Sequence, residues 1–215
     1  MTISVLICVH SQSENNDRLL IQAINSLLMQ TYKEFDVFIV FDECWDKTIE
    51  LVEKQNYKFN ITKLIREKKE GLAYAKNFGL KYITSDRVCF LDADDLYMPN
   101  KIEKQVNYLK TNDVDFLGTQ AWNRYGNNME FKESIFKLGQ YETHEQISER
   151  LKVENIMTHG SMMIKKSCLD ELGGYNHVKG MEDWDLWNRA IDKGYKFYQI
   201  QERLYIYTIG TSVAR

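Results

Sequence analysis

Residues 3–29 read ISVLICVHSQSENNDRLLIQAINSLLM, and this stretch contains the two patterns that decide the fold. The apolar run at residues 3–9 is rich in β-branched side chains and predicts a short buried strand. Apolar residues then recur at helical spacing and predict a helix over residues 18–29. The residues that carry this spacing are Leu19, Ala23, Ile24 and Leu27. A strand that leads into an amphipathic helix is the first part of a β-α-β unit.

The same alternation continues through the first hundred residues. Further strands are predicted at residues 35–41, 61–66 and 87–91, and further helices at residues 46–55 and 72–83. Short apolar strands alternating with longer helices are typical of an α/β fold with a mostly parallel, Rossmann-like central sheet flanked by helices. Open sheets of this kind bind ligands beyond the carboxyl ends of their strands. The residues at those positions are His10, Asp42 and Asp92.

The middle of the chain is less regular. Pro99, the only proline, is placed for the first turn of a helix at residues 100–109, and a strand is predicted at residues 114–122. Residues 123–150 are polar and aromatic, with a turn expected at residues 126–128. We expect this segment to supply strand pieces that line a second pocket.

The last part of the chain returns to regular patterns. An apolar run near residues 157–164 precedes a break at Gly173-Gly174. A helix is then predicted at residues 182–193, and two strands at residues 197–200 and 204–209. A length of 215 residues suits one hydrophobic core better than two, so we expect a single domain.

Composition excludes several classes of protein. Lys and Arg number 28 against 31 Asp and Glu, and the net charge of -3 gives no general electrostatic reason to bind nucleic acid or an anionic membrane. No run of 18 apolar residues and no export signal is visible, so a cytoplasmic protein without a transmembrane segment is expected. Peripheral contact with a membrane stays open. The four cysteines fit no zinc pattern and are expected to be buried, reduced thiols.

An acidic turn follows the strand predicted at residues 87–91. Residues 90–95 read FLDADD, which places Asp92, Asp94 and Asp95 together. Like charges this close are costly unless a cation neutralises them, and a hard divalent cation such as Mg²⁺ or Mn²⁺ does so and can also carry a diphosphate. The alternative is a strand-to-helix turn in which Asp95 or a neighbour caps the next helix.

A second acidic group opens the helix predicted at residues 182–193. Residues 180–187 read GMEDWDLW. Asp183 can act as a general base on a hydroxyl group, and the tryptophans can raise its pKa or stack on a sugar. The alternative is a structural role, in which Glu182 and Asp183 interact with the positive end of the helix and the tryptophans belong to the core.

Further candidates lie near the first strands. Asp42 can accept a hydrogen bond from a nucleobase imide, and Asp46 is expected to cap the next helix. Cys8 and His10 end the first strand at the same edge, although a lone histidine is more often structural. Lys76 can place a cation near phosphate, or it can be an ordinary solvated helix lysine.

Taken in order, these segments resemble glycosyltransferase family 2, a family of inverting enzymes with the GT-A fold. The resemblance covers nearly the whole chain and rests on the order of its motifs, since each motif alone is weak. The matching segments are SVLI at 4–7, SLLMQTY at 26–32, VFDECWDKT at 40–48, GLAYAKNFG at 71–79, FLDADD at 90–95, LGGY at 172–175 and EDWDLW at 182–187.

The resemblance implies a glycosyltransferase of the hexosyltransferase type, acting in polysaccharide biosynthesis. It implies a nucleotide-sugar donor, expected to be a UDP-sugar, bound by the half at residues 1–98, and a glycan or glycolipid acceptor bound by the smaller β/α half at residues 99–215. Nucleic acid is not an expected partner. The implied roles are Asp183 as catalytic base; Asp42, Asp92, His10, Cys8 and Lys76 at the donor nucleotide; Asp94 and Asp92 at a divalent metal, Mn²⁺ or Mg²⁺; and Glu182 and Trp184 at the acceptor.

Three departures from the family pattern are visible. Phe41 stands where the family has the first aspartate of a pair, residues 9–11 read VHS instead of the usual Ser-Tyr-Asn, and Gly210 stands where many relatives carry a histidine that can join the metal. Two other functions stay open. One is a catalytically degenerate module that binds carbohydrate or nucleotide. The other is a nucleotidyltransferase, for which no glycine-rich phosphate loop is visible.

Overall fold

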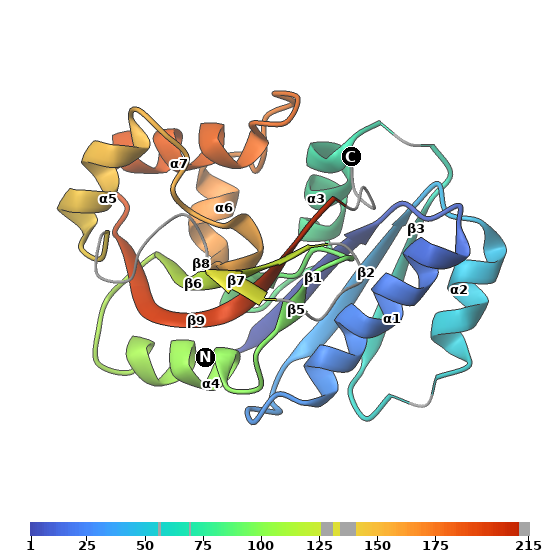
Figure 1. The fold of residues 1–215 in the computed structure, drawn as a ribbon. Helices are drawn as coiled ribbons and strands as arrows, with labels where there is room; N and C mark the ends of the chain where they lie inside the picture. Colours follow the sequence, from blue (N-terminus) through green and yellow to red (C-terminus); the bar gives the residue numbers. More distant parts are fainter. Residues whose placement is uncertain (56, 69, 126–130, 134–140, 211–215) are drawn as a thin grey trace.

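Four parallel strands form one half of the central sheet (Figure 1). The structure is a computed structural model that describes residues 1–55, 57–68, 70–125, 131–133 and 141–210. In spatial order the four strands are β3 (Ile61–Arg66), β2 (Asp36–Asp42), β1 (Ile3–Val9) and β4 (Arg87–Phe90). Their carboxyl ends therefore meet at one edge, as the sequence predicts.

The other half of the sheet mixes directions. In spatial order after β4 come β8 (Met163–Lys165), β6 (Phe116–Tyr125), β9 (Phe197–Ile209) and β5 (Leu96–Tyr97), and β7 (Phe131–Glu133) pairs with β6. β6 and β9 are parallel to each other, and β8 is antiparallel to both β4 and β6. The two strands predicted at 197–200 and 204–209 are one bent strand, because a bulge in its pairing with β6 turns the chain without ending the pairing.

Helices cover both faces of this sheet. One face carries α1 (Glu14–Leu28), α2 (Asp46–Glu53) and α4 (Lys101–Leu109), and the other carries α3 (Leu72–Leu80), α5 (His144–Leu151), α6 (Lys166–Glu171) and α7 (Glu182–Asp192). In β1, Val5 and Ile7 pack toward α1 while Leu6 and Cys8 pack toward α3, since strand side chains alternate. The predicted fold class, α/β with a mostly parallel sheet flanked by helices, is confirmed.

One predicted helix start and two predicted roles at helix starts are wrong. α1 begins at Glu14, four residues before the predicted start, because Ser13 caps a polar first turn that has no apolar periodicity. Asp46 is the first residue of α2 and not its cap, since Trp45 occupies the cap position. Pro99 precedes α4 by two residues instead of lying in its first turn.

The segment predicted as strand pieces contains a helix. Residues 144–151 form α5, which starts with a capping box between Thr143 and Gln146. The turn predicted at 126–128 lies outside the described residues. Only Ile147 and Leu151 are buried in this short helix, so its apolar periodicity is too brief to be distinguished from an irregular segment.

Two predictions from composition can be compared with the fold. All four cysteines are free, and Cys8, Cys89 and Cys168 are buried, as predicted. Within the described ranges, no helix is both long and apolar enough to cross a membrane.

A close approach between α3 and the sheet depends on Gly79. A Cβ atom at this position would lie 2.6 Å from Leu6 Cδ1 and 2.9 Å from Val40 Cγ2, closer than carbon atoms pack. The glycine therefore lets α3 lie directly on β1 and β2. This contact holds Lys76, one turn earlier in α3, above the carboxyl ends of the strands.

Lys101 carries a buried charge whose removal should stabilise the fold. Its side chain is 0% exposed, its Nζ donates to Gln105 Oε1 at 2.9 Å, and it lies 4.0 Å from the centre of the Tyr97 ring. Burial lowers the pKa of Lys101 from 10.5 to about 8. Between these two pKa values the unfolded chain therefore binds more protons than the folded protein, and the free energy of unfolding rises with pH. The buried charge of Lys101 destabilises the fold most below this pH range. We expect Lys101→Met to raise the free energy of unfolding by about 2 kcal/mol at pH 7 and by much less at pH 10.

Urea denaturation at the two pH values measures this effect. Lys110→Met, which alters an exposed lysine just past the same helix, serves as the control and should change the free energy of unfolding little at either pH. If Lys101→Met raises the free energy of unfolding equally at pH 7 and pH 10, the buried charge is not the cause of the stabilisation.

Candidate functional site

A cavity of about 860 Å³ lies at the carboxyl ends of the parallel strands, between α3 and the start of α7. A volume of this size accommodates a small-molecule ligand. Its lining includes residues of α3, the turn after β4, the segment at 155–159, the loop at 177–180, the first turn of α7 and Tyr207 of β9. Four of the residues predicted from the sequence are among them, namely Lys76, Asp92, Glu182 and Asp183.

Lys76 is a buried cation among these carboxylates. Only 3% of the residue is exposed, and its Nζ lies 3.2 Å from Glu182 Oε1. The ammonium group also lies 5.0 Å from the centre of the Tyr175 ring. Its charge lowers the pKa of both Asp92 and Asp183 against the opposing effect of burial. The alternative of an ordinary solvated lysine is therefore wrong.

Asp183 lies in the first turn of α7, where the helix dipole favours a negative charge. One carboxylate oxygen accepts a hydrogen bond from the Trp184 backbone N–H at 2.7 Å, and the other accepts one from Asn155 Nδ2 at 3.1 Å. Burial raises the pKa of Asp183, while Lys76 and these two donors oppose that rise. The carboxylate is thus held in place and made more basic than an exposed aspartate.

The acidic turn after β4 presents its three carboxylates differently. Asp92 lines the cavity, and burial together with Asp94 and other carboxylates raises its pKa to about 6, against the effect of Lys76. Asp95 is 1% exposed and accepts hydrogen bonds from the Tyr205 hydroxyl at 2.7 Å and the Thr208 backbone N–H at 2.6 Å. Asp95 does not cap a helix, because the turn leads into β5.

A divalent cation fits this donor set only in part. Among the described residues, no group of three or more His, Cys, Asp and Glu side chains could hold a metal. Asp92 and Asp94 offer carboxylate oxygens on one turn, and the charge of Asp94 adds to the effect of burial in raising the pKa of Asp92. Mg²⁺ and similar hard ions are commonly bound by one or two carboxylates, with the substrate phosphates and waters completing the shell.

The ends of β1 and β2 are joined by direct hydrogen bonds. His10 Nδ1 lies 2.8 Å from the Asp42 carbonyl oxygen. Asp42 is buried, and its Oδ1 lies 3.4 Å from Nε of Arg66, a residue at the end of β3 that no sequence pattern singles out. Phe41 packs in the core under α1 and α2, so the departure from the family pattern falls on a core position.

Cys8 and Trp184 do not line the cavity. Cys8 is 7% exposed and packs on the α3 side of the sheet, and burial raises the pKa of its thiol to about 12. The Trp184 indole N–H donates to the Leu151 carbonyl oxygen at 2.6 Å, so this side chain is engaged with α5. Trp187 is fully buried in the core.

Asp17 is a buried polar residue that sequence reasoning missed. Its Oδ1 accepts hydrogen bonds from the hydroxyls of Ser11 and Thr48, each at 2.6 Å, and the Trp45 indole N–H lies 3.3 Å from its Oδ2. These contacts tie the loops after β1 and β2 together. The signal was present, since Asp17 shares a helical face with apolar residues of α1 at positions 20 and 24.

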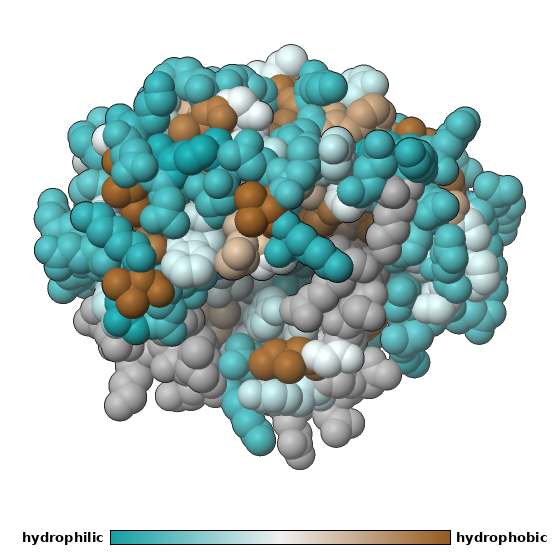
Figure 2. Space-filling view, turned by 90° about the horizontal axis from the view of Figure 1, so that it is seen from above, coloured by the Kyte–Doolittle hydropathy of each residue, from teal (hydrophilic) through white to brown (hydrophobic). Residues whose placement is uncertain are grey.

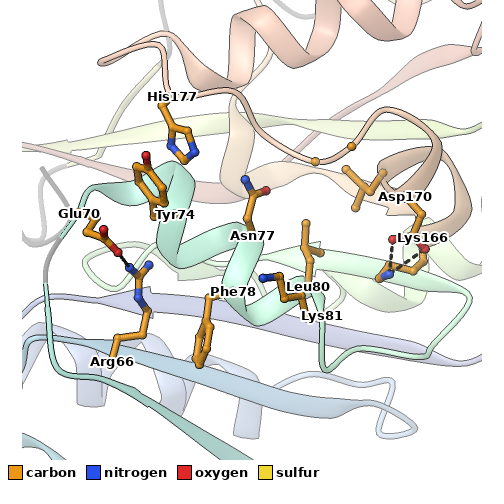
Figure 3. Close-up of a pocket in the computed structure, with 13 residues that line it drawn as sticks. Arg66, Glu70, Tyr74, Asn77, Phe78, Leu80, Lys81, Lys166, Asp170 and His177 are labelled. Carbon is orange, nitrogen blue, oxygen red and sulfur yellow. Dashed lines mark hydrogen bonds and ion pairs between the residues drawn. The ribbon is translucent and has the colours of Figure 1, made fainter.

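A second cavity of about 860 Å³ lies on the other side of α3 (Figure 3). It shares Glu70 and His177 with the first cavity. The Tyr74 ring stacks on the His177 ring with centroids 3.3 Å apart, which joins α3 to the loop that leads into α7. Arg66 pairs with Glu70 at its edge, with Nη2 and Oε2 2.6 Å apart. None of the predicted site residues lines this cavity.

The face above α3 and α7 is mostly hydrophilic. Figure 2 shows apolar side chains there in small separate groups among the described residues. Met181, next to Glu182, is one exposed apolar residue at 47%. Apolar residues exposed singly are normal for a protein surface and need no special explanation.

Comparison with known proteins reveals extended similarity. The family model described as "Glycosyl transferase family 2" matches residues 4–173. An uncharacterized glycosyltransferase of Methanocaldococcus jannaschii is 30% identical over 96% of this chain and 70% of its own length. The O-antigen biosynthesis glycosyltransferase WbnJ of Escherichia coli is 28% identical over 89% of this chain and 72% of its own length.

Solved structures share the fold at lower identity. Staphylococcus aureus TarS 1–349 in complex with UDP-GlcNAc superposes with a TM-score of 0.78 at 19% identity, over 100% of this chain and 60% of TarS 1–349. The mannosyltransferase PcManGT from Pyrobaculum calidifontis, in complex with GDP-Man and Mn²⁺, has a TM-score of 0.71 at 17% identity over 95% of this chain. This chain spans 56% of PcManGT, so both solved proteins are considerably longer.

Proposed function

Since the chain belongs to glycosyl transferase family 2 and has the predicted GT-A fold, we propose that it transfers one sugar from a nucleotide diphosphate sugar to a hydroxyl of a glycan or glycolipid, with inversion. One observation carries this proposal. Lys76, Asp92 and Asp183 come from distant segments of the chain and line one cavity at the carboxyl ends of the strands. The O-antigen biosynthesis role of WbnJ supports a place in polysaccharide biosynthesis.

The donor nucleotide is proposed to be UDP, with its base beside Asp42. This aspartate ends β2, where its buried carboxylate can accept the imide N–H of uracil, and Arg66 and His10 hold the surrounding loops. The UDP-GlcNAc complex of TarS supports a uridine donor, and the GDP-Man complex of PcManGT supports guanosine as the alternative.

The diphosphate is proposed to lie between Lys76 and the acidic turn. Asp94 and Asp92 would hold Mn²⁺ or Mg²⁺, as the Mn²⁺ in PcManGT suggests for a related fold. A metal bound there would offset the negative charge that develops on the diphosphate when its bond to the sugar breaks. The Lys76 ammonium contributes positive charge to the same place from the protein side.

Asp183 is proposed to take the proton from the acceptor hydroxyl as its oxygen attacks the anomeric carbon. The base must approach from the face opposite the diphosphate, and Asp183 comes from α7 whereas the acidic turn comes from β4. Asn155 orients the carboxylate, and the Lys76 ion pair fixes the neighbouring Glu182 at the acceptor side. A single general base of this kind contributes roughly 10²- to 10⁴-fold to the rate.

Asn155→Ala should change the pH dependence of transfer. The Asn155 amide favours the charged form of Asp183 and lowers its pKa, so its removal raises that pKa. Because the base works only when deprotonated, the acid limb of the kcat/KM profile should move to higher pH, with the plateau rate largely retained. Asn188→Ala, which removes an amide on α7 bonded to the Trp184 carbonyl oxygen, is the matched control and should leave the limb in place.

Calorimetric titration with UDP, GDP and dTDP, each with Mn²⁺ and then with EDTA, tests the donor and metal parts of the proposal. Metal-dependent binding of one nucleotide would identify the donor class. Hydrolysis of the matching nucleotide sugar without acceptor then tests the chemistry. Binding without any turnover would favour the degenerate module. If none of the three nucleotides binds, the proposed donor site is contradicted.

A further inference from the structure

A buried arginine in β6, two strands away from β4, contacts the backbone of the acidic turn. Arg124 lies in β6 and is 3% exposed. Its Nη2 donates to the Asp94 carbonyl oxygen at 2.9 Å. Burial lowers the pKa of Arg124, while the nearby charges of Asp95 and Asp94 oppose that shift, so this buried positive charge lies beside the acidic turn.

Thr208 connects the same arginine to two residues of the turn. Thr208 and Arg124 are paired across β9 and β6, and Oγ1 of Thr208 accepts hydrogen bonds from Arg124 Nη2 at 2.7 Å and Nε at 3.1 Å. Its hydroxyl donates to the Asp94 carbonyl oxygen at 2.5 Å, and its backbone N–H donates to Asp95 Oδ1 at 2.6 Å. The turn is therefore held at its main chain and at its buried carboxylate.

Tyr205 completes the support from the same strand. Its hydroxyl donates to Asp95 Oδ2 at 2.7 Å and lies 3.4 Å from the Asp92 backbone nitrogen, which donates to it. A Cβ atom at Gly160 would overlap this hydroxyl, so the glycine is needed for Tyr205 to reach the turn. Of the three carboxylates on the turn, this support therefore binds that of Asp95, while Asp92 lines the cavity.

We infer that Arg124 and Thr208 form a clamp that positions the acidic turn and thereby sets its affinity for a divalent cation. The inference rests on the metal part of the proposed function. Both residues act through the backbone of Asp94, so they are positioning residues and not metal ligands. A turn that carries three carboxylates repels itself, and fixing its main chain keeps two of them oriented for one ion.

Mn²⁺ binding measured by the EPR signal of the free ion tests the clamp, without and with UDP. Arg124→Met and Thr208→Val should each weaken Mn²⁺ binding by about 10-fold or more, the loss that supporting residues around a metal commonly cause. Arg124→Lys should recover part of the affinity, because an ammonium can still donate to the Asp94 carbonyl oxygen. Thr208→Val keeps side-chain size and the backbone N–H, so it carries the test if Arg124→Met does not fold.

Arg87→Met is the matched control. Arg87 is also a buried arginine that donates to two carbonyl oxygens, those of Val114 at 2.8 Å and Asp115 at 3.1 Å, but it lies at the opposite end of β4. The Arg87→Met substitution should lower the stability of the fold, and the variant should bind Mn²⁺ with an affinity within about twofold of that of the unaltered chain. Equal losses for Arg87→Met and Arg124→Met, or unchanged affinity in Arg124→Met and Thr208→Val, would overturn the clamp.

The same measurements separate this inference from the proposed function. Absence of Mn²⁺ binding by the unaltered chain would overturn the clamp together with the metal assignment. Normal Mn²⁺ binding without donor turnover would overturn the transferase proposal alone. Weakened Mn²⁺ binding in the clamp variants, with transfer restored by excess Mn²⁺, would support both.

Discussion

Asp183→Asn should lower the rate of sugar transfer by about 1,000-fold, because the amide cannot accept the proton of the acceptor hydroxyl. The substitution preserves the shape of the side chain and one oxygen that can accept from Trp184 N–H or from Asn155. Binding of the donor nucleotide should therefore be unchanged. Initial rates with saturating donor and acceptor, beside a calorimetric titration of the nucleotide, measure the two effects separately.

Asp192→Asn is the control for this prediction. It alters an exposed aspartate at the other end of α7 and makes the same change of charge. Its rate should match that of the unaltered chain. Transfer by Asp183→Asn at the unaltered rate would remove Asp183 from the mechanism, and equal losses in both variants would point to a general effect of charge.

Asp94→Ala should abolish most of the metal dependence of nucleotide binding. Removing a direct metal ligand lowers metal affinity at least as much as removing a residue that supports a ligand. We therefore expect the affinity for the nucleotide in the presence of Mn²⁺ to fall by about 100-fold. The weaker binding measured in EDTA should persist, because Asp42 and the loops at the ends of β1 and β2 are untouched. Titration of the nucleotide with Mn²⁺ and with EDTA gives both values.

Asp86→Ala provides the comparison for Asp94→Ala. Asp86 is an exposed carboxylate that precedes β4 and is bonded to Thr2, so it lies at the opposite end of the same strand from the acidic turn. Its loss should not alter metal-dependent binding. Unchanged nucleotide affinity in Asp94→Ala with Mn²⁺ present would defeat the assignment of Asp94 to the metal.

The sequence located the first half of the fold to within a few residues. β1 and β3 match their predicted bounds, and β2, β4, α2 and α3 differ by one to three residues. These elements are signalled by local patterns, since a buried strand is a short apolar run and an amphipathic helix repeats its apolar residues. α5 and the bent β9 were misread, because their form depends on a short helix packing on α7 and on a bulge against β6.

Four of the residues predicted from the sequence line the cavity, and three of them are acidic residues near strand and helix ends, where such residues are conspicuous. The sequence could not show that Lys76 is buried beside Glu182, since that pair joins residues 106 positions apart. Arg66, Asn155 and Arg124 had no local signal at all. Each is an ordinary polar residue in its own segment, and its role arises from a partner on another element.

The sequence by itself determined the fold class, the family and the positions of the carboxylates, because each of these depends on residue type, local spacing and the order of motifs along the chain. The tertiary structure alone decided which charges are paired and which donors hold the acidic turn. Lys76, Asp92 and Asp183 share one cavity, and Arg124 in β6 and Thr208 in β9 support the backbone of Asp94. The physical reason is that hydrogen bonds and burial depend on distance in space, which spacing along a chain does not record.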